Sequence, residues 1–239
     1  MSKLLVLYVF HIYNERVKQF IENAIFKDDN VDFIIISNDK NNKFIAPNYV
    51  KILFRDNIGY DFGGWSEALL KNNLYENYDN FIFVNSSVSG PYILPYYKHK
   101  WTQIYIDGLR DNVKLFGSTI NTCGNPLNSS HVQSYIFSMD KTTLKYLIDC
   151  EIFSMTNNAT TFDNAIYHKE IQMSRYILKN NWNIGCLLSY YRDVDFTFKN
   201  KKPEEYNLRF LDDIMYPYYI NKLWKLQEIV FIKGNRFSL

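Results

Sequence analysis

The amino-terminal half of the chain alternates between two hydrophobic patterns. Nearly continuous apolar runs lie at residues 4–10, 33–36, 50–54 and 81–84, and helix-spaced apolar residues lie within 14–26 and 64–72. Short apolar runs bounded by polar turns are typical of strands that are buried on both faces of a sheet. The alternation therefore predicts βαβ units and an α/β fold, with a Rossmann-like, mixed but mainly parallel central sheet flanked by helices.

The pattern is looser after Pro91. We expect further strands at 114–119, 132–139 and 182–188, and helices at 101–109, 141–150 and 161–180. The apolar or small side chains near one face of the last helix are Phe162, Ile166, Ile171, Ser174 and Ile177. Residues 1–202 are expected to form one domain. The aromatic-rich residues 203–239 are expected to form a C-terminal extension of two short helices packed on it.

Charge and cysteine content exclude several classes of protein. The 27 basic and 25 acidic residues give a net charge of +2, so no overall field predicts a nucleic-acid partner. The three cysteines are odd in number and widely spaced, which fits neither a disulfide framework nor a zinc site. The apolar run at 4–10 is too short for a signal segment or a membrane span. These features predict a cytoplasmic protein without a transmembrane segment.

Two polar loops follow neighbouring strands of the predicted sheet. Residues 55–65 read RDNIGYDFGGW, a glycine-rich turn that opens a helix, and residues 85–87 read NSS at the end of a buried strand. Open α/β sheets bind ligands at the carboxyl ends of their strands, and glycines let a backbone approach a ligand closely. We therefore expect a nucleotide-diphosphate site at this edge of the sheet.

The order of strands, helices and polar strand ends resembles the GT-A fold of nucleotide-sugar glycosyltransferases over residues 3–200. Tyr13-Asn14-Glu15 is similar to a turn of family 2 transferases, where the aromatic ring lies near the uracil. Residues 37–39 fall where that family places acidic residues on the base and ribose. The resemblance implies a UDP-sugar donor and an oligosaccharide acceptor as partners.

Several sequence motifs resemble more closely those of a family that includes the amino-terminal domain of a large chlorovirus glycosyltransferase. These are FVNSSV at 83–88, NIGYDFGGW at 57–65, and HVQS at 131–134 after the GSTIN run at 117–121. The resemblance implies a virus-encoded enzyme of the host cytoplasm that builds the glycan of a capsid protein. L-rhamnose is one candidate for the transferred sugar.

The residues expected to bind the donor share positions at strand ends or in the glycine-rich turn. They are His11, Tyr13, Ser37, Asn38, Asp39, Arg55, Asn57, Gly59, Gly63, Gly64, Asn85, Ser86, Ser87 and His131. Some of them have alternative interpretations. Arg55 is also explained as a surface salt-bridge residue, and His11 and His131 as structural histidines.

The expected metal site departs from the usual pattern. GT-A enzymes commonly hold a divalent metal with an Asp-x-Asp at the position of Asn85-Ser86-Ser87, which has no carboxylate. Amide and hydroxyl oxygens are weaker ligands for Mn²⁺ or Mg²⁺. We therefore expect a weakly bound, donor-dependent metal at Asn85 and Ser87, with Asp61 or Asp195 as a further ligand. The alternative is that Asn85 and Ser87 only cap a turn.

Glu170 and Asp61 are the candidate catalytic residues. Glu170 precedes the last predicted strand, where family 2 transferases carry an acidic residue that faces the acceptor, and it could deprotonate or orient an acceptor hydroxyl. Asp61 is expected either to bind donor-sugar hydroxyls or to cap its helix. Two other functions stay open: an S-adenosylmethionine-dependent methyltransferase, although the glycines follow the third strand rather than the first, and a non-catalytic sugar-binding module.

Overall fold

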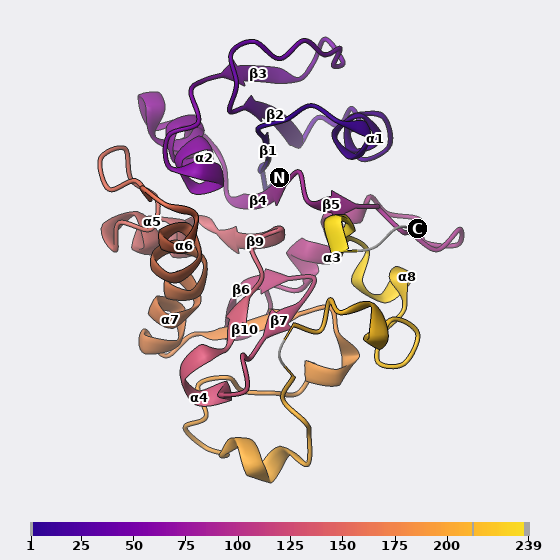
Figure 1. Ribbon diagram of the computed structural model, residues 1–239, viewed down its shortest axis with the longest axis vertical. Helices are drawn as coiled ribbons and strands as arrows, with labels where there is room; N and C mark the ends of the chain where they lie inside the picture. Colours follow the sequence, from indigo (N-terminus) through magenta and orange to yellow (C-terminus); the bar gives the residue numbers. More distant parts are fainter. Residues whose placement is uncertain (1, 212, 237–239) are drawn as a thin grey trace.

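A computed structural model describes residues 2–211 and 213–236, and its centre is a seven-stranded sheet in the order β10-β6-β9-β4-β1-β2-β3 (Figure 1). The strands of this sheet are β1 (Leu4–Phe10), β2 (Val31–Ser37), β3 (Lys51–Phe54), β4 (Asn80–Asn85), β6 (Val113–Gly117), β9 (Ile136–Asp140) and β10 (Asn183–Cys186). All neighbouring strands pair in parallel except β9, which is antiparallel to both β4 and β6. The predicted mixed, mainly parallel α/β sheet is confirmed.

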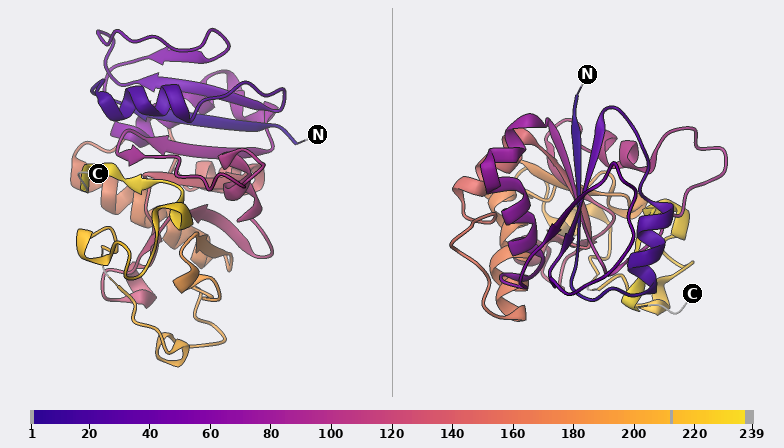
Figure 2. Two further views of the ribbon diagram at one scale, coloured as in Figure 1. Left: turned by 90° about the vertical axis from the view of Figure 1, so that its right-hand side faces the viewer. Right: turned by 90° about the horizontal axis from the view of Figure 1, so that it is seen from above.

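Helices cover both faces of the sheet (Figures 1 and 2). They are α1 (Glu15–Asn23), α2 (Tyr60–Leu70), α3 (Trp101–Asp107), α4 (Pro126–Ser129), α5 (Lys141–Asp149), α6 (Phe162–Ala165), α7 (Gln172–Lys179) and α8 (Leu226–Ile229). Helices α2, α5, α6 and α7 lie on one side of the sheet, and α1, α3 and the chain's C-terminal part lie on the other. No helix in the described part of the chain is both long and apolar enough to cross a bilayer.

The central strand β1 shows why the core has two halves. Its side chains point alternately to opposite faces, as in any strand. Leu5, Leu7 and Val9 pack with α2, α5 and α7, whereas Val6 and Phe10 pack with α1 and α3. Every residue of β1 is buried, which explains its unbroken apolar sequence.

Three predicted elements differ from the structure in instructive ways. Helix α2 begins at Tyr60 rather than at residue 64, because Gly59 takes the left-handed conformation (φ 77°) as its N-cap. The strand predicted at 132–139 is divided into β8 (His131–Val132), which pairs with β7 (Ile120–Asn121), and β9. The helix predicted at 161–180 is α6 and α7 joined by a π-helical segment, Ile166–Ile171.

The C-terminal extension is less helical than expected. Its described part contains 3₁₀ turns at Pro203–Tyr206, Pro217–Tyr219 and Gly234–Arg236, the single-turn helix α8 and the strand β11 (Ile232–Lys233). Strand β11 pairs antiparallel with β5 (Val88–Ser89), which directly follows the loop at 85–87. Residues 212 and 237–239 of the predicted extension lie outside the described residues.

Candidate functional site

A cavity of about 680 Å³ lies where β4 ends, between α2, the π-helical segment, β8 and the C-terminal segment. Ligand sites of proteins commonly have volumes of about 300–1,000 Å³. Six of the predicted site residues line it: Asp61, Asn85, Ser86, Ser87, His131 and Glu170. Other lining residues include Tyr60, Asn121, Gln133, Ser134, Phe162, Tyr167, Asp213, Lys233, Asn235 and Arg236.

Asp61 and Asn85 form one wall of the cavity. The Asn85 Nδ2 donates to Asp61 Oδ2 at 3.0 Å, and Ser87 donates to Asn85 Oδ1 from both its backbone N and its hydroxyl. Burial raises the pKa of Asp61 to about 6; the hydrogen bond from Asn85 lowers the pKa, and the negative charge of Glu170 raises it. Asp61 is thus a largely desolvated carboxyl that is half-buried in the cavity wall and lies within the electrostatic influence of a second acid, Glu170.

The alternative role of Asp61 as a helix N-cap is wrong. Gly59 occupies the N-cap position and makes no side-chain capping bond, and Asp61 lies within the first turn of α2. A carboxylate in the first turn is favoured by the helix dipole. Among the described residues, however, the hydrogen bond that the Asp61 side chain accepts comes from Asn85 at the end of β4. The side chain therefore belongs to the cavity wall rather than to the helix end.

Glu170 forms the opposite wall. Ser134 Oγ donates to Glu170 Oε2 at 2.6 Å, and His131 Nε2 lies 3.7 Å from Glu170 Oε1. The other ring nitrogen of His131 bonds the carbonyl oxygen of Ser129 at 2.7 Å, which directs Nε2 toward the glutamate. The structure therefore gives Glu170 two fixed neighbours, unlike an exposed helix glutamate.

The π-helical segment sets the orientation of Glu170. Lys169, the preceding residue, is buried and donates its Nζ to the carbonyl oxygen of Glu151 at 2.6 Å, on the protein side of the helix. Burial also lowers the pKa of Lys169. π-helical turns are rare and occur frequently at functional sites, because the extra residue re-aims side chains. Here Tyr167 and Glu170 both line the cavity.

The residues predicted near the nucleotide base lie at the ends of β1 and β2. His11 is exposed and its Nδ1 is 3.0 Å from the Asn38 carbonyl oxygen, while Ser37 Oγ donates to the carbonyl oxygen of Asp39. The Tyr13 ring stacks with that of Phe44 at 5.9 Å between centroids. They share the carboxyl edge of the sheet with Asn85, because β1 pairs with both β2 and β4. Among the described residues, none of them lines the 680 Å³ cavity.

Arg55 is buried and stabilises the glycine-rich turn through hydrogen bonds. Its guanidinium donates to Glu67 Oε2 (2.8 Å), Asn38 Oδ1 (2.7 Å) and the Ile58 carbonyl oxygen (2.7 Å), and it is only 6% exposed. The alternative of a surface salt bridge is therefore wrong. The predicted phosphate contact has no support either, because all three guanidinium nitrogens are engaged and Arg55 lies away from the cavity.

The glycines of this turn are explained by packing. A Cβ on Gly63 would lie 2.0 Å from the Ile58 carbonyl oxygen, and one on Gly64 would lie 2.9 Å from Val9 Cγ2. Gly64 thus lets α2 lie close against β1, and Gly63 leaves room for the carbonyl oxygen of the preceding turn. Gly59, with its left-handed backbone, would meet Asn158, and Asn57 is exposed away from the cavity. Backbone approach to a ligand is not needed to account for these residues.

The residues at the cavity do not fit a resident divalent metal. Both donors of Ser87 point at Asn85 Oδ1, so the oxygens expected to coordinate the ion bind each other. Asp195 instead accepts from the backbone and hydroxyl of Thr197, and among the described residues it does not line the cavity. No group of three or more His, Cys, Asp or Glu side chains within the described ranges is placed to hold a metal ion.

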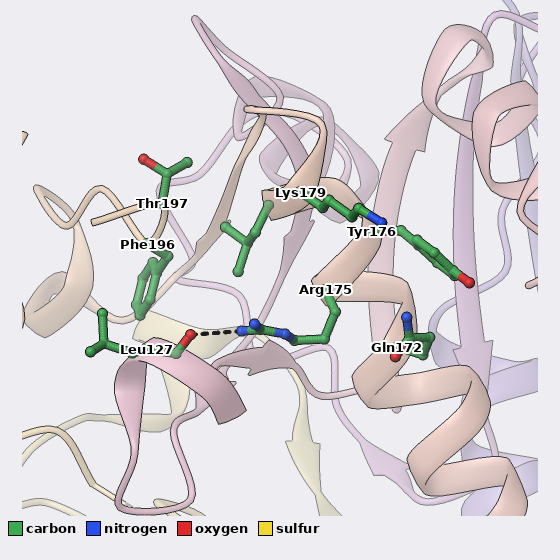
Figure 3. A pocket seen from close by; sticks show the side chains of 8 residues that line it. Leu127, Gln172, Arg175, Tyr176, Lys179, Phe196 and Thr197 are labelled. Atoms are coloured by element: carbon green, nitrogen blue, oxygen red, sulfur yellow. Dashed lines mark hydrogen bonds between the residues drawn. The ribbon is translucent and has the colours of Figure 1, made fainter. Parts of the chain in front are cut away.

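A second groove of about 530 Å³ lies between α4 and α7 (Figure 3). Arg175 Nη1 donates to the Leu127 carbonyl oxygen at 2.8 Å across it, and Lys179 and Thr197 lie on its walls. Its described lining contains no acidic residue and none of the predicted site residues. The cavity beside Asp61 is therefore the candidate functional site.

Comparison with known proteins gives the family of the chain. Residues 33–214, more than half of its length, match the model of the rhamnan synthesis protein F family, RgpF. The chain belongs to this family. The match includes Asp61, Asn85, His131 and Glu170, but ends before β11.

The RgpF-family chain is also similar to the virulence protein VirA of Vibrio anguillarum, both from strain ATCC 68554 / 775 and from the species without a stated strain. Each is 25% identical over 181 residues, which cover 73% of this chain and 53% of the relative. The chain thus spans about half the length of the curated relatives it matches.

Proposed function

We propose that this chain is a glycosyltransferase that moves a sugar from a nucleotide-sugar donor to a glycan acceptor. The observation that carries the proposal is the pair of acids Asp61 and Glu170, which line one cavity at the carboxyl edge of a mainly parallel sheet. Each acid is fixed by a partner, Asn85 for Asp61 and Ser134 for Glu170. Membership of a family named for rhamnan synthesis supports sugar transfer as the activity.

The proposed donor is a UDP-sugar, with L-rhamnose as the first candidate sugar. Its base would lie near Tyr13 and residues 37–39, at the ends of β1 and β2. Its diphosphate would lie near the loop at 85–87, at the end of the adjoining strand β4. This path follows the carboxyl edge of the sheet, where open α/β folds bind ligands. The family name supports rhamnose, whereas uridine as the base rests on the sequence resemblance alone.

The proposed reaction forms a bond between an acceptor oxygen and C1 of the sugar, while the bond from C1 to the β-phosphate oxygen breaks. Asp61 would accept hydrogen bonds from donor-sugar hydroxyls. Glu170 would take the acceptor proton in an inverting reaction, or orient the acceptor in a retaining one. Ser134 Oγ, at 2.6 Å, would hold the Glu170 carboxylate in place for either role.

Donor-dependent binding of Mn²⁺ or Mg²⁺ stays a prediction from the GT-A resemblance. A metal held mainly by the donor would polarise the diphosphate, and Asp61 is the carboxylate nearest to the expected position at Asn85. No step of the proposed reaction depends on it. A viral origin and a capsid glycan as acceptor are likewise predictions from the chlorovirus resemblance.

A thermal-shift panel tests the proposed function. We expect UDP and UDP-rhamnose to raise the melting temperature of the protein, because a ligand that binds only the folded state stabilises it by mass action. The panel would include UDP-glucose, GDP-mannose, S-adenosylmethionine and a free oligosaccharide, each with and without Mn²⁺. A shift with S-adenosylmethionine alone would indicate a methyltransferase. A shift with free oligosaccharide but with no nucleotide would indicate a sugar-binding module.

A further inference from the structure

The C-terminal segment brings two cationic side chains to the cavity. Strand β11 pairs antiparallel with β5, so Lys233 lies opposite Val88, and the Gly234 backbone N donates to the Ser87 carbonyl oxygen at 2.6 Å. Lys233 and Arg236 both line the cavity that contains Asn85, Ser86 and Ser87. The pairing of β11 with β5 and the bond from Gly234 to Ser87 place both side chains next to the loop at which the diphosphate is expected.

This segment is fixed by burial on both sides of β11. Phe231 is fully buried, with its ring 5.0 Å from that of Trp101, and Ile232 is buried in the opposite core. A Cβ on Gly234 would lie 2.1 Å from Ser89 Oγ, so the turn that leads to Arg236 packs closely on β5. The two cations are therefore presented by an anchored strand rather than by a loose tail.

The charge of Lys233 is not neutralised by a neighbour. Within residues 2–211 and 213–236 its ammonium group makes no hydrogen bond or ion pair, although the residue is half-buried. Arg236 Nη2 lies 3.5 Å from Asp213 Oδ2, with the two side chains 49% and 32% exposed. A long, exposed pair of this kind is weak and leaves most of the guanidinium donors available.

Arg16 also contacts this loop, close to Gly234 and outside the described cavity lining. Its Nε donates to the Ser86 carbonyl oxygen at 3.4 Å, which adds positive charge beside the loop. The side chains of Asn85, Ser86 and Ser87 are themselves neutral. Asp61, Asp213 and Glu170 are the acids among the described lining residues, and Asp61 and Glu170 lie on the walls assigned to the sugar and the acceptor.

We propose that Lys233 and Arg236 bind the diphosphate of the nucleotide donor and stabilise the leaving group. This inference rests on the proposed function. As the C1–oxygen bond breaks, its electron pair passes to the β-phosphate oxygen, and fixed cations next to that oxygen stabilise the developing charge. Arginine suits phosphate because its planar guanidinium donates two parallel hydrogen bonds, and lysine acts as a point charge. The two side chains supply the positive charge that an Asp-x-Asp enzyme obtains from its metal.

Calorimetric titration of UDP in EDTA tests this inference. The variants are Lys233→Gln and Arg236→Gln, with Lys179→Gln from the groove of Figure 3 and the exposed Arg192→Gln as controls that remove the same charges elsewhere. Uridine serves as a ligand with the same base and no phosphate. We expect each cavity variant to weaken UDP binding by about ten- to a hundredfold, the value of a charged hydrogen bond. Uridine binding, and UDP binding to the two controls, should match the wild type.

The remaining outcomes separate the two proposals. Wild-type affinity for UDP in both cavity variants would overturn the role of the cations and leave the proposed function standing. UDP binding that requires Mn²⁺ and is then equal in wild type and variants would also overturn it. A wild-type protein that binds neither UDP nor uridine would refute both. Lys233→Arg, which keeps the charge, should retain most of the UDP affinity, and its loss would point to a structural role instead.

Discussion

Replacing Asp61 by Asn should make the protein more stable at neutral pH while abolishing its activity. An aspartate in the unfolded chain titrates near 3.8, and folding raises the pKa of Asp61 to about 6. The folded state therefore holds this proton more tightly, and ionisation of Asp61 lowers the free energy of unfolding as pH rises from about 4 to 6. The cost reaches roughly 3 kcal/mol above pH 7. An amide avoids this cost and still accepts the hydrogen bond from Asn85.

Urea denaturation of the wild type and Asp61→Asn at several pH values measures the effect. We expect the variant to be more stable by about 1–3 kcal/mol at pH 7.5, with a difference that shrinks below roughly 1 kcal/mol near pH 4. Asp56→Asn is the control, since Asp56 pairs with Lys40 and both side chains are more than half exposed. It should change stability by less than about 0.5 kcal/mol. An Asp61→Asn protein that is less stable than the wild type, or a difference that does not vary with pH, would refute the argument.

Three further substitutions test separate parts of the site. Glu170→Gln should reduce transfer by about a hundredfold or more, because the amide cannot take the acceptor proton. UDP binding should be unchanged, and a loss of UDP affinity would contradict an acceptor-side role. Ser134→Ala should reduce kcat by a smaller factor, about tenfold, because Glu170 loses the hydrogen bond that positions it, and unchanged kinetics would show that this bond has no function. Arg55→Met should lower the free energy of unfolding, measured by urea denaturation, by about 3–5 kcal/mol, because Glu67 and Asn38 lose a buried partner. A stable variant with weakened UDP binding would instead support the interpretation of Arg55 as a phosphate contact.

The strands that were predicted correctly are recognisable from the hydrophobic pattern of their own residues. Leu4–Phe10 and residues 81–84 of β4 are continuously apolar because both faces of these strands are covered, and this pattern can be read without knowing which strands they pair with. The break between β8 and β9 could not be predicted in this way, because the intervening residues Gln133 to Tyr135 include no glycine or proline that would mark a turn. The early start of α2 depends on the left-handed backbone of Gly59. The sequence of a turn does not show which backbone conformation its glycine adopts.

The candidate site shows the same limit. Asp61, Asn85 and Glu170 could be proposed from the sequence, because each follows or precedes a recognisable strand or helix. The burial of Arg55 could not, because its three acceptors come from separate segments of the fold. Lys233 and Arg236 were missed since β11 is only two residues long and reaches the cavity through pairing with the distant β5.

Release of free nucleotide from sugar donors tests the proposed glycosyltransferase activity most directly. The purified chain would be incubated with UDP-rhamnose, UDP-glucose and GDP-mannose, with and without a rhamnan oligosaccharide as acceptor. We expect UDP to be released from UDP-rhamnose, faster with the acceptor present, and the release to be lost in Asp61→Asn and Glu170→Gln. Release that is equally fast in these two variants, or no release from any nucleotide sugar in the presence of acceptor, would contradict the account.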